Sequence, residues 1–307
     1  MFYTFLLSIM SSNLLLDFLF SFALAGVVLG STISQEPISF DQNYEVTWGG
    51  DHVLSFDQGR EVELSMDRAS GSGFASKSTY GSGFFRMKIK LPGRNSAGVV
   101  TAFYLSSSGS KHDELDFEFL GNKEGKPYTL QTNVFADGEG NREQRLHLWF
   151  DPTKDFHSYG ILWNPYQVVF FVDEIPIRVF KNKSHNGVGY PTKAMRVIAS
   201  LWNGEDWATD GGKTKIDWTY APFTAQFQGF NADGCPDYNS DEHKLISDDD
   251  HDQCSSQKQI WWWNSDKYRT LNSDQQKLYQ SVKEKYVNYD YCNDVSRFQV
   301  LPPECPQ

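Results

Sequence analysis

The chain has 307 residues, a formal net charge of −11 at pH 7 and 15% aromatic residues, among them 9 Trp and 15 Tyr. This length suits one large all-β domain or two ordinary ones, and the acidity makes nucleic acid and anionic membrane surfaces poor partners while leaving neutral polymers open. The many flat rings suit stacking on sugar rings as well as the filling of a core.

Residues 1–30 have the pattern of a secretory signal peptide. An apolar region begins near Leu14, and residues 23–25 or 28–30 offer a small-residue cleavage site. Asp17 interrupts the apolar stretch, and a charge at the centre of a bilayer is costly. We therefore predict secretion and no membrane association once the signal is removed, with an uncleaved membrane anchor as the alternative.

From about residue 44 to 230 the sequence predicts short strands rich in β-branched and aromatic residues, separated by turn residues. No helical pattern intervenes, so we predict an all-β sandwich or barrel that occupies residues 31–232. The expected strands are 45–48, 62–66, 84–91, 99–105, 114–120, 129–135, 145–150, 159–163, 168–172, 177–180, 196–202 and 223–230.

The composition changes after residue 235, and we predict that residues 233–307 form an extension packed on the sandwich. Residues 237–252 are rich in Asp, but their spacing does not fit an EF-hand, so we expect a solvated acidic loop instead of a calcium site. A helix is expected from Ser273 to Tyr286, with Ser273 as its N-cap and an apolar face made by Leu278, Val282 and Tyr286.

All four cysteines lie in this extension, and an even number in an exported protein suggests two disulfides. Four cysteines permit three connectivities, and the sequence alone does not choose among them. No C-x-x-C pair or group of His accompanies them, so a zinc site is not expected. The cysteines are Cys235, Cys254, Cys292 and Cys305.

The segment 112–121 carries the most chemical information. Apolar Leu115, Phe117 and Phe119 alternate with acidic residues, so three carboxyl groups are expected on the opposite face of one strand. Neighbouring like charges disfavour full ionisation, so we expect the group to share a proton and one pKa to be raised. The three acidic residues are Glu114, Asp116 and Glu118.

This arrangement suits a retaining glycosidase, which needs an ionised nucleophile and a protonated acid roughly 5–5.5 Å apart. Glu114 and Glu118 have Cα atoms about 13 Å apart at about 3.3 Å per residue, and side chains that lean together leave a gap of about 5–6 Å. Asp116 between them can hydrogen-bond to the nucleophile. The alternatives are an acidic surface strand and a metal site made by His112, Glu114 and Asp116.

At this strand the sequence closely resembles the xyloglucan endotransglucosylase/hydrolases of plant cell walls, within glycoside hydrolase family sixteen. The resemblance covers roughly residues 38–305. Besides the catalytic strand it rests on Gln131-Thr132-Asn133, residues 140–144, Trp149-Phe150-Asp151-Pro152-Thr153, residues 200–203, Asp206-Trp207-Ala208-Thr209, residues 229–232, Tyr291-Cys292 and Pro302-Pro303-Glu304-Cys305.

The resemblance implies a concave jelly-roll β-sandwich with the substrate lying across one sheet. It implies Glu114 as nucleophile, Glu118 as acid/base and Asp116 as assisting residue, and it implies the disulfides Cys235–Cys254 and Cys292–Cys305. The implied glucan-binding residues are Gln131, Thr132, Asn133, Asn141, Arg142, Glu143, Asp206, Trp207, Gly211 and Arg297.

Two further features, a glycosylation sequon and a tryptophan, lead to expectations of their own. The sequon at Asn182 predicts the one glycosylation site, since Asn122-Lys123-Glu124 is not a sequon. Trp202 ends an apolar strand and is expected in the core.

Taken together, these features predict a secreted monomer of the cell wall or apoplast that cuts a xyloglucan donor chain and joins it to a xyloglucan acceptor chain. No metal or organic cofactor is expected. The alternatives are a xyloglucan hydrolase, a glucanase that acts on mixed-linkage glucan or cellulose, and a lectin-like wall protein that binds glucan without turnover.

Overall fold

The computed structural model describes residues 38–237, 254 and 261–305. The expected signal peptide and nearly all of the acidic loop lie outside these residues. Within them, no helix has both the length and the apolar character that a membrane crossing requires.

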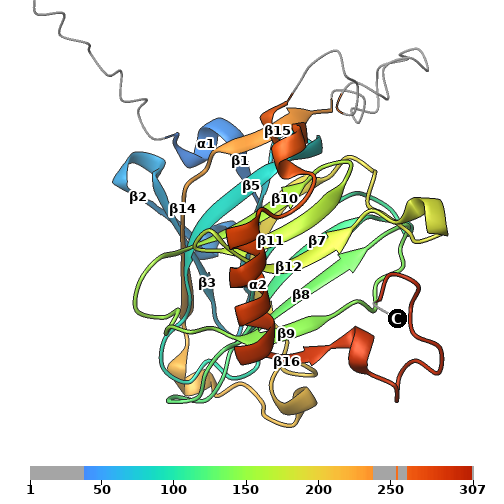
Figure 1. Ribbon diagram of the computed structural model, residues 1–307. Helices are drawn as coiled ribbons and strands as arrows, with labels where there is room; N and C mark the ends of the chain where they lie inside the picture. Colours follow the sequence, from blue (N-terminus) through green and yellow to red (C-terminus); the bar gives the residue numbers. More distant parts are fainter. Residues whose placement is uncertain (1–37, 238–253, 255–260, 306–307) are drawn as a thin grey trace, which may run out of the picture. The chain divides into compact units, whose positions relative to one another are not determined.

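Two antiparallel sheets form the fold (Figure 1). The first sheet has the strand order β1-β4-β13-β6-β7-β8-β9-β16, and the second has the order β12-β11-β10-β5-β14-β3-β2, with β15 paired to β5. The strand that carries the three carboxyl groups is β7 (Glu114–Leu120), near the middle of the first sheet.

The other strands and the α-helices have the following bounds. In the first sheet they are β1 (Tyr44–Trp48), β4 (Ser72–Ser76), β13 (Arg196–Asn203), β6 (Val99–Ser106), β8 (Thr129–Phe135), β9 (Gln144–His147) and β16 (Val287–Asp290). Elsewhere they are β12 (Ile175–Lys181), β11 (Gln167–Val172), β10 (His157–Trp163), β5 (Tyr80–Lys90), β14 (Phe223–Gln228), β3 (Glu61–Met66), β2 (Val53–Phe56), β15 (Ala232–Pro236), α1 (Phe40–Asn43) and α2 (Ser273–Lys285).

All twelve expected strands are present, and β7 and β8 have the expected bounds. The sequence did not predict β2, β4, β15 or β16. Ser72-Gly73-Phe74-Ala75-Ser76 has the composition of a turn, yet β4 is buried along its whole length between β1 and β13. Its small residues fit there because neighbouring strands, and not its own propensity, hold it in place.

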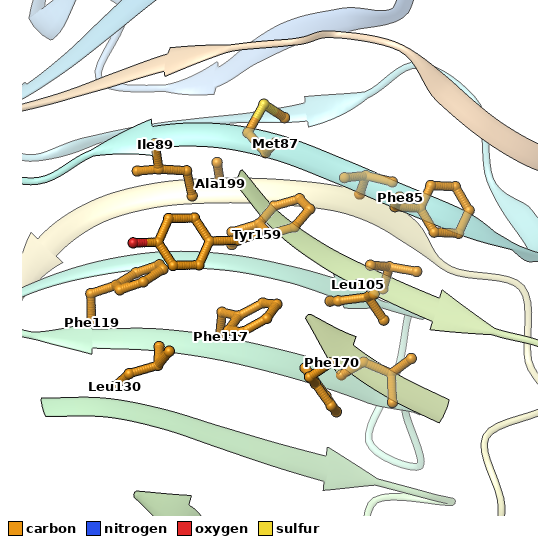
Figure 2. Close-up of a cluster of buried hydrophobic side chains, with 14 of the residues drawn as sticks. Phe85, Met87, Ile89, Leu105, Phe117, Phe119, Leu130, Tyr159, Phe170 and Ala199 are labelled. Atoms are coloured by element: carbon orange, nitrogen blue, oxygen red, sulfur yellow. The ribbon is translucent and has the colours of Figure 1, made fainter. Parts of the chain in front are cut away.

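The core lies between the sheets and combines aromatic rings with aliphatic side chains (Figure 2). Phe117 and Phe119 from β7 are fully buried and meet side chains of the second sheet. The Tyr159 ring lies 4.6 Å from that of Phe119 in an edge-to-face contact, and the Phe170 ring lies 5.1 Å from that of Phe117. Each such ring stabilises the fold by about 1.5–3 kcal/mol through burial, so the orientation of β7 is firmly fixed.

The C-terminal extension is joined to both sheets. Strand β16 pairs with β9 at the edge of the first sheet, while α2 packs against β12 of the second sheet. The disulfides are Cys235–Cys254 and Cys292–Cys305, the pairing that the resemblance implied.

Helix α2 has the expected place but a different cap and a different buried face. Asn272 is the N-cap, and its side chain accepts hydrogen bonds from Asp274 and Gln275, so the expected cap at Ser273 was wrong by one residue. Leu278 is 44% exposed, whereas Val282 is buried. The helix therefore packs on β12 with Tyr279 and Val282 and leaves Leu278 toward solvent, so its buried face is shifted from the one that its spacing suggested.

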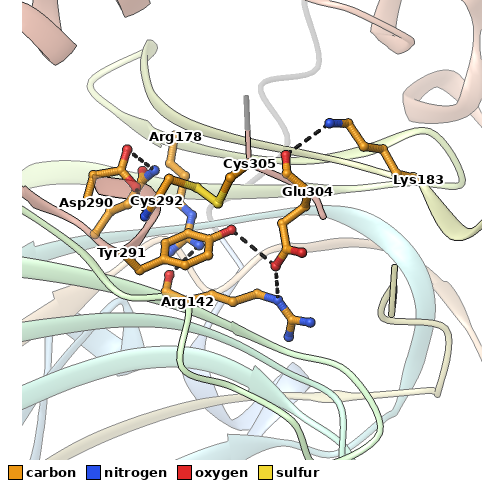
Figure 3. The surroundings of a disulfide bond; sticks show 9 residues. Arg142, Arg178, Lys183, Asp290, Tyr291, Cys292, Glu304 and Cys305 are labelled. Atoms are coloured by element: carbon orange, nitrogen blue, oxygen red, sulfur yellow. Dashed lines mark hydrogen bonds and ion pairs between the residues drawn. A yellow bond between two sulfur atoms is a disulfide. The ribbon is translucent and has the colours of Figure 1, made fainter. Parts of the chain in front are cut away.

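A buried polar network ties the end of the extension to the sandwich (Figure 3). Glu304 accepts a hydrogen bond from Arg142 at 2.7 Å and one from Tyr291 at 3.3 Å. The backbone carbonyl of Glu304 accepts a hydrogen bond from Lys183. These groups surround the disulfide that closes residues 292–305, so the chain end is held by covalent and ionic contacts at one place.

We expect Glu304→Gln to lower the free energy of unfolding by about 3–5 kcal/mol, because it leaves the buried Arg142 without its charge partner. The two side chains are only 11% and 6% exposed. Denaturant unfolding of the full chain with both disulfides intact measures this. The control is Asp274→Asn, which removes an ion pair to Lys277 whose side chains are 83% and 79% exposed; an equal loss in both variants would contradict the assignment.

Candidate active site

Strand β7 presents its three acidic residues on the face of the first sheet that points away from the core. Leu115, Phe117 and Phe119 are fully buried, so alternation directs Glu114, Asp116 and Glu118 to the opposite side, as predicted. We call this side the carboxylate face. Asp116 is 6% exposed, whereas Glu114 and Glu118 are half-buried and open to solvent on either side of it.

The electrostatics of this group favour protonation. Burial raises the pKa of Asp116 well above its usual range, and the charges of Glu114 and Glu118 raise it further. Asp116 and Glu114 also share a side-chain hydrogen bond. A protonated Asp116 can donate in that bond and stabilise Glu114 as an anion, which is the state that a nucleophile requires.

Glu118 sits in a second hydrogen-bonded chain. Burial raises its pKa, the hydrogen bond from Gln131 lowers it, and the charge of Glu114 raises it again. The Gln131 amide donates to Glu118 at 2.6 Å and accepts from Arg145 at 2.7 Å. The Arg145 guanidinium lies over the ring of Tyr289 on β16. This chain fixes the orientation of Glu118 and moderates the rise of its pKa, as suits a group that gives and later takes a proton.

Tyr104 of β6 lies directly beside the acidic group, because β6 places it opposite Asp116. Burial and the charges of Glu114 and Asp116 raise the pKa of Tyr104 to about 12, so its hydroxyl keeps its proton at neutral pH.

The hypothesis of a metal site gains no support from the geometry. His112 Nε2 lies 3.9 Å from Glu114, and the His112 ring packs beside Phe135. In the portion of the chain that the structure describes, no three or more His, Cys, Asp or Glu side chains are grouped as a metal ion would need.

Asp113 is a positioning residue that the sequence did not reveal. It is 2% exposed, and its carboxylate accepts backbone hydrogen bonds from Asp137, Thr192 and Lys193 at 2.7–2.8 Å. These bonds fasten two loops to the beginning of β7. The sequence hides this role, because Asp113 stands just before the first carboxylate and looks like one more acidic residue of the group. The only signal that could have suggested it is the alternation of the strand.

The three consecutive residues expected to bind glucan on β8 do not act alike. Gln131 and Asn133 lie on the carboxylate face, opposite Glu118 and Asp116 respectively. Thr132 points into the interior, where it is 1% exposed and accepts a hydrogen bond from Arg178. Its side chain is therefore placed away from any glucan on the carboxylate face, because alternation sends the middle residue of the three to the core.

The polar group around Arg297 brings the extension to the edge of β9. Arg297 donates to Asn141 at 2.5 Å and to Glu143 at 2.7 Å. Arg142, between those two, points inward, where it is 9% exposed and bonded to Glu304. Asn141, Glu143 and Arg297 are thus brought together as a surface cluster, and Arg142 is a structural support of that cluster.

The loop after β13 carries the remaining expected residues. Asp206 is exposed and pairs with Lys215 at 2.9 Å, and Gly211 has a positive φ of 64°. Trp207 packs against Trp202 with a centroid distance of 6.1 Å. Trp202 pairs with Val100 and so belongs to the carboxylate face and not to the core, which corrects the expectation from its apolar strand.

The sequon residue Asn182 lies just after β12 and is half-buried. Its side-chain amide donates to the carbonyl of Pro165 at 2.8 Å. A glycan on this nitrogen would have to replace that hydrogen bond, so glycosylation stays a prediction.

Comparison with known proteins assigns the family. The model for glycosyl hydrolases family 16 matches residues 40–220, and the model for the xyloglucan endo-transglycosylase C-terminus matches residues 256–305. The chain is 59% identical over 268 residues to xyloglucan endotransglucosylase/hydrolase protein 2 of Arabidopsis thaliana, covering 87% of this chain and 89% of that protein. It belongs to the xyloglucan endotransglucosylase/hydrolase family.

Further relatives and solved structures agree. Xyloglucan endotransglucosylase protein 34 of Populus tremula x Populus tremuloides is 49% identical over 269 residues, covering 87% of this chain and 88% of that protein. A Bacillus licheniformis β-glucanase superposes with a TM-score of 0.50 at 22% identity, over 61% of this chain and 89% of that one. The superposition shows the shared jelly-roll fold, and the family membership makes the chain an enzyme of the retaining glycosyl transferase or hydrolase type.

We predict that Asp116→Asn gains stability relative to the wild-type xyloglucan endotransglucosylase/hydrolase as pH rises. A raised folded pKa means that folded Asp116 holds its proton above about pH 4, where the unfolded chain releases it, so its contribution to stability is lost as pH rises through the folded pKa. Thermal unfolding across a pH series measures the difference between variant and wild type.

The control for that series is Asp137→Asn. Lys193 lowers the pKa of Asp137, so this carboxylate stabilises the fold above its unfolded pKa, and that contribution is lost as pH falls through the folded pKa. The control should therefore lose stability relative to wild type as pH rises. The same sign for both variants would contradict the assignment.

We also predict that Gln131→Met moves the alkaline limb of the activity profile to higher pH. The substitution removes the hydrogen bond that lowers the pKa of Glu118 and releases Arg145 from its place, and both changes favour the protonated acid. Initial rates on xyloglucan across pH measure the limb. The control is Gln226→Met on β14 of the second sheet, which should leave the limb in place; an acidic shift in Gln131→Met would refute the role.

Proposed function

We propose that this protein is a xyloglucan endotransglucosylase that works through a covalent glycosyl-enzyme. The observation that carries the proposal is the acidic group on β7: two carboxyl groups with raised pKa values, Asp116 and Glu118, beside Glu114 on one strand face. In the first step Glu118 gives its proton to the glycosidic oxygen while Glu114 attacks the anomeric carbon, and the C–O bond to the leaving chain breaks.

In the second step Glu118 takes a proton from the hydroxyl group of an incoming sugar chain, whose oxygen attacks the anomeric carbon and releases Glu114. Two inversions retain the configuration of the glycosidic bond. Asp116 holds Glu114 in place by their hydrogen bond throughout.

Transfer to a sugar outcompetes hydrolysis only if the acceptor chain is held in position, because water is abundant. The C-terminal extension offers groups that could hold the acceptor chain. It lengthens the carboxylate face by β16, and it brings Arg297 to Asn141 and Glu143 at the edge of β9. These groups, together with Gln131 and residues of the loop at 206–211, offer hydrogen bonds to sugar hydroxyls.

The cellular setting is part of the proposal. The names of the relatives include xyloglucan. We infer that xyloglucan is both the donor substrate and the acceptor substrate of this protein. The signal-like residues 1–30 and the two disulfides support export to the cell wall. We further propose that the mature protein acts as a monomer, with catalytic residues in 31–232 and a supporting extension from 233.

The test is transfer of label from a tagged xyloglucan oligosaccharide into high-mass xyloglucan by the purified protein. Glu114→Ala should lower incorporation by at least about 10³-fold, since the residues of such a group act as a unit. Azide added to that variant should restore bond cleavage by taking the place of the missing carboxylate, with an inverted glycosyl azide as product.

The outcomes separate the candidate activities. Label in the polymer with wild type and not with Glu114→Ala supports the transferase. Shortened polymer with new reducing ends and no incorporated label would make the protein a hydrolase. Binding without either product would overturn catalysis and leave a glucan-binding protein.

A further inference from the structure

Trp48 reaches the carboxylate face by way of a β-bulge. In the pairing of β1 with β4, Val46 lies opposite Phe74 and Trp48 lies opposite Gly73, so Thr47 is the extra residue. In a regular pairing without the bulge, Thr47 would lie opposite Gly73 and Trp48 opposite Ser72, on the side of the buried Phe74. A bulge that turns one side chain to the other face of a sheet is a device found beside binding sites.

Gly73 of β4 and Gly71 just before it let the indole of Trp48 lie close against the sheet. A Cβ added at Gly73 would come within 2.4 Å of the indole Nε1, and one added at Gly71 within 3.1 Å of the far edge of the ring. Side chains at these positions would displace the ring. Trp48 is nevertheless 41% exposed, so part of its ring surface remains open to solvent on an edge strand.

The register of the sheet connects this ring to the acid/base residue. One cross-strand row runs from Glu118 through Ala102, Ser200 and Gly73 to Trp48. The three residues between the ends are small and buried, whereas the neighbouring rows carry larger side chains: Tyr104 and Ile198 on one side, Val100 and Trp202 on the other. The row is therefore a low strip bordered by bulkier residues.

The dimensions of the strip suit an extended chain. Gly73, under the indole, is three strand spacings from β7, or about 14 Å at about 4.8 Å each. On the other side of Glu118 the same row continues through Gln131 and Arg145 to Tyr289. An aromatic ring thus ends the row at each edge strand, with the acid/base residue between them.

We propose that Trp48 is a stacking platform for a sugar ring of the glucan backbone several units away from the bond that is cut, at the end of the carboxylate face opposite the C-terminal extension. The apolar C–H face of a pyranose packs on the indole as other apolar groups do. Trp48 then sets specificity for chain length, because a chain long enough to reach the indole binds more tightly than a short oligosaccharide. The inference rests on the proposed function.

The experiment measures binding without turnover. Xyloglucan oligosaccharides of increasing backbone length are titrated calorimetrically into Glu114→Ala and into the same protein with Trp48→Leu. Leucine keeps apolar bulk against the glycines but has no flat ring. We expect roughly tenfold weaker binding of the long oligosaccharides, which is the worth of about 1.4 kcal/mol, and unchanged binding of the short ones.

Two further variants make the result specific. Trp48→Phe keeps a flat ring and should retain most of the affinity for long chains. Trp262→Leu is the matched control, because Trp262 is also 41% exposed but packs on Phe84 of the second sheet, and it should change nothing. Thermal unfolding of every variant establishes that it is folded.

The outcomes distinguish this inference from the function on which it rests. If long oligosaccharides bind Glu114→Ala more tightly than short ones and Trp48→Leu leaves that gain intact, the platform is refuted while the function stands. An equal loss for short and long chains would also refute it. If no oligosaccharide binds Glu114→Ala and wild type transfers no label, the proposed function itself fails.

Discussion

The alternation of β7 is the constraint on which the rest of the site depends. Phe117 and Phe119 anchor one side of the strand among the rings between the sheets, and this fixes the other side with its three carboxyl groups. Repulsion among these groups would favour a different arrangement if the strand were free to turn. Burial of the aromatic side supplies the free energy that holds Asp116 in a place where its pKa is strongly raised.

The residues around β7 have two kinds of role: some hold the backbone in place, and others contact the catalytic carboxyl groups. Asp113 and Arg178 are buried and form hydrogen bonds to backbone groups, and Arg178 also to the Thr132 side chain, which fixes the loops and strands that border the acidic residues. Gln131 touches Glu118 directly and links it to Arg145. Substitution of Asp113 or Arg178 would change the positions of the catalytic groups. Substitution of Gln131 or Arg145 would change the pKa of Glu118 instead.

The C-terminal extension belongs to the same construction although it follows the sandwich in sequence. Strand β16 completes the first sheet beside β9, and Glu304 pairs with Arg142 beneath the loop that carries Asn141 and Glu143. The extension therefore sets the position of polar groups on the carboxylate face. Loss of the extension would expose the edge of β9 and remove Arg297 from its partners.

The sequence by itself determined the twelve strands, the acidic face of β7 and the place of α2, because alternation and local propensity act between near neighbours in the chain. Only the tertiary structure decided that β4 is a strand, that Trp202 and Trp48 lie on the carboxylate face, and that Arg142 points inward. These outcomes depend on pairing register, on a single bulged residue and on partners distant in sequence, and local pattern carries no information about any of them.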